Sequence, residues 1–341
     1  MAWKACFPKA ELPPRGLGRK LPSMMSMTNM TNMTNMTNMT STSSTSSTSA
    51  LEAQLAHWRS WVGRMDSRTD LVTAAPLHAL AATLDRDEPE PLPGADVPPL
   101  AHWLYFLPVA AAREIGPDGH AQRGAFLPPV PLPRRMWAGG RLDFHHPLQV
   151  GDEITRHSRI AQVDAKPGRS GPLVFVTVRH EISNARGLAL TEEHDIVYRD
   201  APAPGAAASS AVAAAQPAPQ LAPTDASFSR DIVPDPVLLF RYSALTFNGH
   251  RIHYDRRYVT EVEGYPGLVV HGPLIATLLV DLLRRERPQA RLKRFAFTAV
   301  RPSFDTHRFQ VCGRDDGSST FQLWARDHEG CLTMRAEART E

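Results

Sequence analysis

The sequence predicts an α+β fold of two similar halves, in which antiparallel strands wrap a buried helix. Three observations support this prediction. Runs that alternate between apolar and polar residues recur between turns in both halves of the chain. Residues 273–287 are apolar almost all round, as expected for a buried helix. An Ala- and Pro-rich tract at residues 203–223 reads as a linker between the halves, which are residues 51–202 and 224–341.

Residues 1–50 lack the pattern of a folded domain. Residues 27–40 repeat Met-Thr-Asn, and residues 41–49 contain only Ser and Thr. A segment with so little to bury is expected to be disordered. Basic residues near its start resemble a transit peptide, but the Ala-, Arg- and Pro-rich body favours a start site placed too far upstream, with the true one among residues 24–39.

The N-terminal half is predicted to begin with helices. Residues 51–65 have the pattern of an entry helix, and Thr73 is placed to cap a second helix with Pro76 in its first turn. The aromatic cluster at residues 103–106 then opens a strand or an apolar wall. Four alternating runs follow and are predicted to be antiparallel strands, at residues 140–144, 153–163, 173–182 and 188–198.

The C-terminal half is predicted to repeat this order. Residues 240–248 lead into a loop rich in histidine, and residues 273–287 form the long buried helix. Arginines in its last turn favour the helix dipole, and Pro288 ends it. Four further strands are predicted at residues 295–302, 308–314, 320–326 and 331–338.

Composition excludes several classes of protein. The net charge is only +3, which gives no argument for a nucleic-acid partner. No apolar run reaches the roughly 18 residues that a membrane span needs. The three cysteines form no CxxC pair, which fits a reducing compartment, and we expect a cytoplasmic protein.

The segment at residues 248–277 carries most of the functional signal. Its loop contains His250 and His253, and a Gly/Pro turn then leads to His271 and Gly272 at the start of the long helix. Imidazole is the side chain best suited to move protons near neutral pH. A glycine at a helix N-terminus leaves backbone N–H groups free to hold a developing oxyanion. This combination suits the reversible addition of water to an enoyl thioester.

This segment resembles the MaoC-like (R)-specific enoyl-CoA hydratases and hydroxyacyl-thioester dehydratases. Their signature is Asp-x-Asn-Pro-Leu-His, followed after a spacer by His-Gly before a central helix. Residues 242–283 look most similar to a double hot-dog subgroup that includes type 2 dehydratases and mesaconyl-C4-CoA hydratases, and the resemblance covers residues 51–341. It implies a double hot-dog fold, in which each unit has a long central helix wrapped by an antiparallel sheet.

The resemblance also assigns roles to individual residues. It places the catalytic histidine at His253 and the oxyanion glycine at Gly272. The catalytic aspartate of the family falls on Asn248, whose amide can orient water but cannot take its proton. Either His253 works alone or a second proton-transfer group lies elsewhere. Asp255 is the nearest carboxylate in sequence, and a loop-capping or salt-bridging role is favoured for it.

Four further residues are candidates for contact with substrate. Arg251 replaces the proline of the signature and is either solvated or bound to a substrate carboxylate, which would favour dicarboxylyl thioesters. His250 supports the loop or lines the pocket, Tyr242 lines the pocket, and His271 caps the helix or faces substrate. His250 and His253 form an HxH pair without a further ligand at a recognisable spacing, so no metal and no cofactor is predicted.

No copy of the signature occurs in the N-terminal half. His145 and His146 lie between a strand and a turn and lack a helix partner. We therefore expect residues 51–202 to be a degenerate hot-dog unit that supplies packing and part of the acyl tunnel. Residues 224–341 are expected to be the catalytic MaoC-like unit.

The expected function is that of a hydro-lyase acting across the 2,3 bond of an enoyl- or 3-hydroxyacyl-CoA thioester, or the corresponding acyl-carrier-protein thioester. A short dicarboxylyl substrate, mesaconyl-C4-CoA or itaconyl-CoA, is the specific expectation. The alternatives are a hot-dog thioesterase, with Asp281 as the available helix carboxylate, and a non-catalytic acyl-binding subunit. Two hot-dog units in one chain already reproduce a hot-dog dimer, so a monomer and a homodimer of double units both fit.

Overall fold

The computed structural model describes residues 52–124, 126–168, 171–200 and 219–341. The predicted disordered leader at residues 1–50 and most of the predicted linker at residues 203–223 lie outside these ranges. Within the described residues, no helix is long and apolar enough to cross a membrane.

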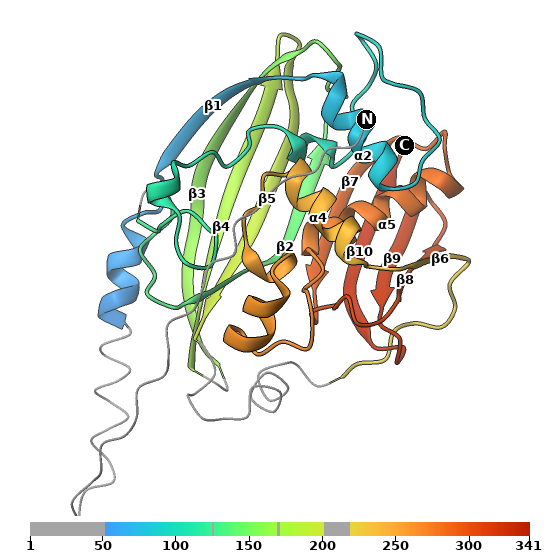
Figure 1. Cartoon of the computed structure of the whole chain (residues 1–341). Coiled ribbons are helices and arrows are strands. Elements are labelled where there is room, and N and C mark those ends of the chain that lie inside the picture. Colours follow the sequence, from blue (N-terminus) through green and yellow to red (C-terminus); the bar gives the residue numbers. More distant parts are fainter. Residues whose placement is uncertain (1–51, 125, 169–170, 201–218) are drawn as a thin grey trace, which may run out of the picture. The chain divides into compact units, whose positions relative to one another are not determined.

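An antiparallel sheet of ten strands forms the framework of the described residues (Figure 1). The first half of the chain contributes β1 (Met65–Leu71), β2 (Arg134–Phe144), β3 (Glu153–Gly168), β4 (Gly171–Asn184) and β5 (Gly187–Arg199). The second half contributes β6 (Phe228–Ile232), β7 (Leu292–Ala299), β8 (Phe309–Asp315), β9 (Thr320–Arg326) and β10 (Leu332–Thr340).

The strand order of the two halves is the same. The full order is β1-β3-β4-β5-β2-β7-β10-β9-β8-β6, so each half begins at an outer edge and places its second strand at the centre. The halves join where β2 pairs with β7, from Gly139 opposite Thr298 to Asp143 opposite Arg294. On the basis of this repeated strand order, we propose that the chain divides into an N-terminal and a C-terminal hot-dog unit.

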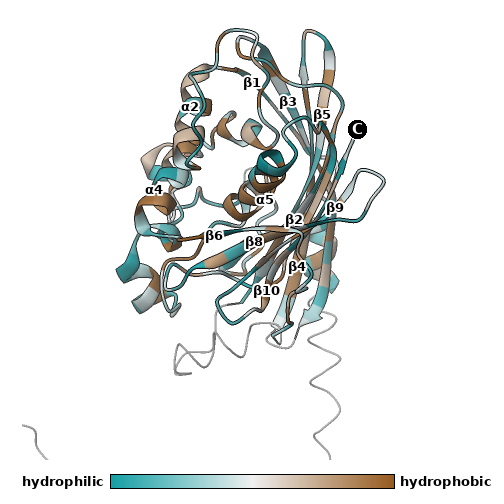
Figure 2. Cartoon of the chain, turned by 90° about the vertical axis from the view of Figure 1, so that its right-hand side faces the viewer, coloured by the Kyte–Doolittle hydropathy of each residue, from teal (hydrophilic) through white to brown (hydrophobic). Residues whose placement is uncertain are grey.

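The central helix of the second half is α5 (Gly272–Glu286), close to the predicted residues 273–287. All ten residues from Leu274 to Leu283 are buried, because the helix packs against β8, β9 and β10 on one side and lies beneath other helices on the other (Figure 2). Burial of so many aliphatic side chains fixes α5 in place, and it thereby fixes the position of its N-terminus.

The helix between β1 and β2 in the first half differs from α5. It is α2 (Ala74–Thr83), which has ten residues and packs on α4 (Pro236–Leu245) and on a short 3₁₀ helix, η1 (Ala101–Leu104). Among the described residues, the first half therefore has no helix as long as α5. The prediction of a long central helix in each unit holds only for the second half, and in the first half the inner face of the sheet is left open to a cavity.

Several predicted elements differ in extent from the observed ones. The predicted strand at residues 320–326 matches β9, whereas β2 begins six residues before the predicted residues 140–144. Residues 52–59 are helical, but Met65 already belongs to strand β1, so the predicted entry helix is shorter. Helix α4 was not predicted, because prolines precede it. Pro236 occupies the first turn, where no N–H bond is lost, and Asp235 caps the helix by accepting the N–H of Leu238 at 2.8 Å.

Candidate active site

A cavity of about 1350 Å³ lies between the two halves of the chain. One wall is the inner face of strands β2 to β5. The opposite wall is formed by the loop at residues 115–121, by the histidine loop at residues 248–254 and by the N-terminus of α5. Pockets for small ligands commonly have 300–1,000 Å³, so this cavity has room for a large substrate.

His253 is held in the cavity wall as a neutral base. It belongs to the 3₁₀ helix η3 (Arg251–His253), and only 8% of its surface is exposed. Its Nδ1 lies 2.7 Å from the carbonyl oxygen of Val269. A carbonyl can only accept, so Nδ1 carries the proton and Nε2 keeps its lone pair. Burial lowers the pKa of His253 to about 4, which keeps the ring neutral near pH 7.

His271 supports His253 from behind. The two rings stack with centroids 3.7 Å apart and planes at 16°. His271 is fully buried, and its Nε2 lies 2.8 Å from Oγ of Ser243 on α4. Burial lowers the pKa of His271 well below its usual value. Its side chain does not cap α5, although His271 stands at the N-cap position as predicted. The side chain faces the back of His253 and not the substrate space.

Gly272 begins α5 and lines the cavity. The first N–H groups of a helix have no partner within it, so they can receive a negatively charged oxygen. A Cβ placed on Gly272 would meet only the carbonyl oxygen of Trp137, at 3.9 Å. Packing within the protein therefore does not require glycine here. The space around this position borders the cavity that Gly272 lines.

Asn248 lines the cavity but is partly engaged by its own loop. Its Oδ1 accepts the backbone N–H of His250 at 3.0 Å. The amide therefore shapes the histidine loop, and only its Nδ2 can donate to a bound molecule. Tyr242 on α4, which was also predicted to line the pocket, borders the cavity, and its hydroxyl lies 3.4 Å from Oγ1 of Thr277.

The contacts of Arg251 do not support the carboxylate-binding alternative for this residue. Its guanidinium makes two bonds to Asp255, at 3.0 and 2.8 Å, and one to the carbonyl of Pro117 at 3.0 Å. It also lies 4.1 Å over the ring of Tyr258 and is not among the residues that line the cavity. Arg251 is thus committed to the loops around the site, and Asp255 has the salt-bridging role favoured from the sequence.

Sequence reasoning missed the loop at residues 115–121. His120 lines the cavity, and its Nδ1 lies 3.0 Å from Oδ2 of Asp118. The ring of His120 contacts that of His250, with centroids 4.0 Å apart. The only signal in the sequence was the triplet Asp118-Gly119-His120, which lies more than a hundred residues before the histidine loop.

Asp118, His120 and His250 place their ligand atoms within 4.8 Å of one another, close enough to hold a metal ion. Both carboxylate oxygens of Asp118, however, already accept hydrogen bonds from His120, one from the ring and one from the backbone N–H. The arrangement is therefore better described as a carboxylate–histidine pair than as a metal centre.

A second group of polar side chains lines the cavity on the inner face of the N-terminal sheet. Glu192 is buried and accepts from the ring of His102 at 3.0 Å and from the indole of Trp103. Burial alone would raise the pKa of Glu192, but the hydrogen bond from His102 and the electrostatic interactions with His102, His180 and His194 together outweigh it and lower the pKa to about 2. His180 lies beside it and bonds to Ser158 at 2.8 Å. This half therefore supplies polar walls as well as the expected packing.

Comparison with solved structures identifies the fold. A MaoC-like dehydratase from Phytophthora capsici superposes with a TM-score of 0.58 at 15% identity, covering 82% of this chain and 96% of that chain. HtdX of Mycobacterium tuberculosis gives a TM-score of 0.54 at 16% identity, covering 81% and 100%. The predicted double hot-dog fold of MaoC-like dehydratases is confirmed.

Sequence comparison then gives the family. The model for hydroxyacyl-thioester dehydratase type 2 matches residues 100–305, and the chain belongs to that family. It is 45% identical over 281 residues to mesaconyl-C(4)-CoA hydratase of Chloroflexus aurantiacus, covering 82% of this chain and 97% of the relative. It is 28% identical to the mitochondrial hydroxyacyl-thioester dehydratase type 2 of Schizosaccharomyces pombe, covering 75% of this chain and 90% of the relative.

Proposed function

We propose that this protein is a hydro-lyase that adds water reversibly across the 2,3 bond of an enoyl-CoA thioester. The observation that carries the proposal is the state of His253. Its Nδ1 donates to the carbonyl of Val269, which leaves Nε2 free, and His253 lines the same cavity as the N-terminus of α5. A neutral base next to unpaired backbone N–H groups is the arrangement that conjugate addition of water requires.

In the proposed hydration, Nε2 of His253 takes a proton from water as the water oxygen bonds to C3. The electrons of the C2=C3 double bond move onto the thioester oxygen, which is held by the N–H groups at Gly272 and the dipole of α5. A proton then reaches C2 and the thioester carbonyl re-forms. Asn248 donates from Nδ2 to orient the water, because its Oδ1 is already engaged.

The substrate best supported is a short dicarboxylyl thioester such as mesaconyl-C4-CoA, the compound in the name of the relative that is 45% identical. Two arginines, Arg135 on β2 and Arg156 on β3, stand on the inner wall of the cavity among apolar residues such as Phe175. Neither forms a salt bridge with a carboxylate of the described residues, and the guanidinium of Arg156 lies 4.8 Å from the ring centroid of Phe106. These arginines replace Arg251 as candidate ligands for the second carboxylate.

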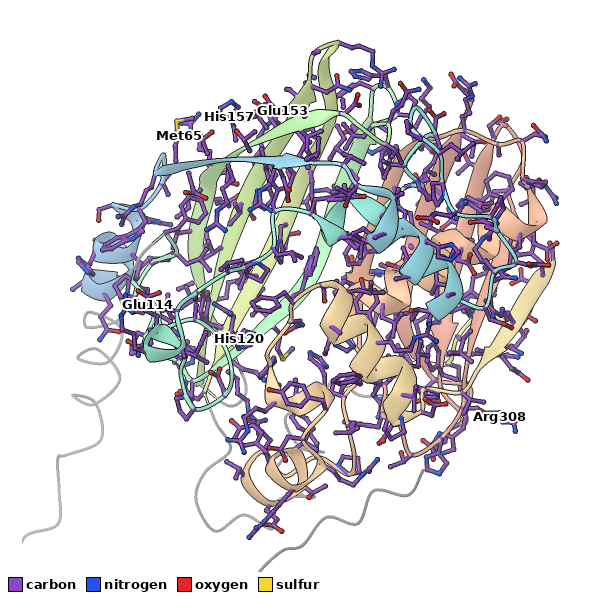
Figure 3. The ribbon with its side chains drawn as sticks, turned by 45° about the horizontal axis from the view of Figure 1, so that its top comes forward. Met65, Glu114, His120, Glu153, His157 and Arg308 are labelled. Carbon is purple, nitrogen blue, oxygen red and sulfur yellow. The ribbon has the colours of Figure 1, made fainter. Side chains whose placement is uncertain are left out.

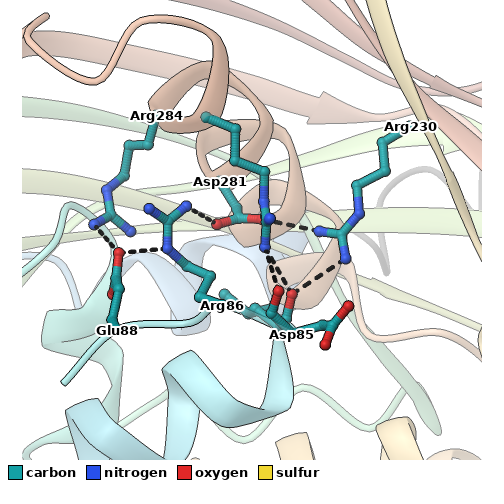
Figure 4. A network of polar contacts seen from close by, with 8 residues as sticks. Asp85, Arg86, Glu88, Arg230, Asp281 and Arg284 are labelled. Atoms are coloured by element: carbon teal, nitrogen blue, oxygen red, sulfur yellow. Dashed lines mark hydrogen bonds and ion pairs between the residues drawn. The ribbon is translucent and has the colours of Figure 1, made fainter. Parts of the chain in front are cut away.

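The geometry disfavours a thioesterase that uses the helix carboxylate. Asp281 is only 1% exposed and binds three guanidinium groups, those of Arg86 at 2.7 Å, Arg230 at 3.1 Å and Arg285 at 2.8 Å. Figure 4 shows how this network ties α5 to the loop after α2. Asp281 does not line the cavity, so it has a structural role in this chain.

A panel of thioesters tests the proposed function. The purified protein is incubated with mesaconyl-C4-CoA, itaconyl-CoA, crotonyl-CoA and a long-chain enoyl-CoA, and the hydrated products are quantified. The proposal predicts hydration, with the dicarboxylyl thioesters turned over fastest. Binding of every thioester without hydration would instead identify a non-catalytic acyl-binding subunit.

Two finer expectations remain predictions attached to this proposal. They are a cytoplasmic location, and a monomer or a homodimer of double hot-dog units. Measurement of the molar mass in solution decides between the two oligomeric states.

A further inference from the structure

We propose that His120 is a second proton-transfer residue of this active site, with Asp118 as its positioning residue. In this proposal the pair supplies the proton-transfer capacity that the family signature places in the carboxylate at position 248, where this chain has Asn248. The inference rests on the proposed hydratase function and adds a residue to its mechanism.

The first support is the geometry of the pair. Oδ2 of Asp118 lies 3.0 Å from Nδ1 of His120, and Oδ1 accepts the backbone N–H of His120 at 3.0 Å. The carboxylate therefore fixes both the backbone and the ring, and it leaves Nε2 as the free ring nitrogen. His120, which is labelled in Figure 3, lines the cavity, whereas Asp118 is not among the residues that line it. A carboxylate behind an imidazole is a recurrent way to orient a catalytic histidine.

The second support is that the loop of His120 is built onto the histidine loop. The backbone N–H of Arg251 donates to the carbonyl of Asp118 at 2.9 Å, and the guanidinium of Arg251 donates to Pro117. Gly119 has φ +89°, and a Cβ there would overlap the carbonyl oxygen of Gly249. This close approach of two glycines holds the loops in one register, so the place of His120 is defined by the fold.

The third support is the row of histidine rings that begins at His120. His120 contacts His250 at 4.0 Å between ring centroids, His250 contacts His253 at 5.4 Å, and His253 stacks on His271. In this row only His120 has a carboxylate partner among the described residues. Burial lowers the pKa of His120, and the carboxylate of Asp118 acts against that shift, so Asp118 stabilises the imidazolium that forms when His120 takes up a proton during turnover.

The departures from the family signature then have a common explanation. Asn248 shapes the loop through the N–H of His250, His250 packs on His120, and Arg251 fastens the loop that carries Asp118. These three of the four residues that differ from the signature contribute to bringing the pair from the other half of the chain to the site.

The proposed step balances in atoms and charge. His253 takes a proton from water as the C3–O bond forms, and the π electrons move to the thioester oxygen. The proton then passes from His253 through water in the cavity to Nε2 of His120, where Asp118 stabilises the imidazolium. His120 gives this proton to C2 as the carbonyl re-forms, so one water has been added and both rings are neutral again.

The test uses steady-state kinetics of the full chain on the thioester that the wild-type protein hydrates best. His120→Gln is expected to lower kcat about 100-fold with KM changed less than about threefold, the scale of one general acid–base group. Asp118→Asn keeps an oxygen that can accept from Nδ1 but removes the charge, and it should lower kcat about tenfold, whereas Asp118→Glu should recover part of that loss. Gln122→Ala, directly after the same loop, is the control and should keep wild-type kinetics.

A rescue experiment separates proton transfer from a structural role. If His120 moves a proton, added imidazole should restore part of the kcat of His120→Ala in a concentration-dependent way, with an unchanged melting temperature. Wild-type kcat in His120→Gln, or a loss confined to KM, would overturn the inference. So would a stoichiometric metal ion whose removal abolishes activity. If the wild-type protein hydrates no thioester, the proposed function itself fails, and this outcome is distinct from a failure at His120 alone.

Discussion

At His253 the important contact is the one that Nδ1 makes with the backbone. The bond from Nδ1 to the carbonyl of Val269 selects the tautomer, and stacking on His271 fixes the plane of the ring. The sequence motif could predict that a histidine stands here. It could not predict the tautomer, because Val269 lies sixteen residues later in the chain and approaches His253 only in the folded protein.

Replacing Arg251 is predicted to affect stability and not the choice of substrate. Because its guanidinium bonds to Asp255 and Pro117 outside the cavity, Arg251→Ala should lower the turnover of mesaconyl-C4-CoA and crotonyl-CoA by a similar factor. The melting temperature should fall by roughly 2–4 °C, the effect of about 1 kcal/mol in a protein of this size. Arg257→Ala, which removes a neighbouring surface arginine, is the control. A loss restricted to the dicarboxylyl thioester would show that Arg251 reaches the substrate.

Among the elements, the N-terminus of helix α5 is the one on which the proposed binding of the thioester oxygen depends. Gly272→Ala should leave the fold intact, because the added methyl group meets only one atom, at 3.9 Å, and alanine favours a helix. The methyl group would stand where the thioester carbonyl approaches, so kcat/KM should fall roughly 10- to 100-fold. Measurement of kcat/KM together with the melting temperature checks this. Wild-type kinetics in the variant would mean that the substrate carbonyl binds elsewhere.

The network around Asp281 gives a second prediction for the same helix. Asp281→Asn leaves three guanidinium groups without their shared carboxylate, so the free energy of unfolding should fall by roughly 3 kcal/mol. Hydratase kcat should remain within about twofold of wild type at a temperature where the variant is folded, because Asp281 lies outside the cavity. Glu286→Gln, on the exposed surface of α5, is the matched control. Complete loss of activity in a folded Asp281→Asn variant would revive a catalytic role for this carboxylate.

The helix and strands with a regular apolar pattern could be predicted from the sequence. The edge strands, which are defined by hydrogen bonding to a neighbouring strand, could not be predicted in this way. The apolar run of α5 and the alternating strands β3 to β5 and β8 to β10 were placed within a few residues. The edge strands β1 and β6 carry mostly polar side chains, as an outer strand with exposed residues does, and therefore lacked the apolar alternation that identifies a strand. The loop of Asp118 has no periodic pattern, and only the tertiary fold brings it to the site.

For the whole molecule, the buried histidines predict a dependence of stability on pH. Burial lowers the pKa of His253 and of His180 to about 4 and that of His194 to about 3. In the unfolded chain these rings bind protons near pH 6.5, so below that pH the unfolded state binds more protons than the folded one. Stability is therefore complete above about pH 6.5 and is lost as the pH falls toward 4.

Thermal unfolding between pH 7 and pH 5 measures this effect. The melting temperature should fall by roughly 5 °C or more over that interval. The low pKa of Glu192, at about 2, adds a further loss only below pH 4.5, so it does not contribute in this window. His194→Gln removes one titrating ring and should show a shallower fall. A melting temperature that is flat from pH 7 to pH 5 would contradict the buried, neutral state of these histidines.

His253 is the proposed base for addition of water to an enoyl-CoA thioester, and a paired assay of hydrated product and free thiol tests this role. Wild-type protein and His253→Gln are assayed side by side with mesaconyl-C4-CoA, following the hydrated product and the release of free thiol in the same samples. We expect hydration without thiol release in the wild type, and at least about a 100-fold lower kcat in a folded His253→Gln variant. Thiol release as the main product would contradict the hydratase function, and near-wild-type hydration by the variant would contradict the role of His253 as the base.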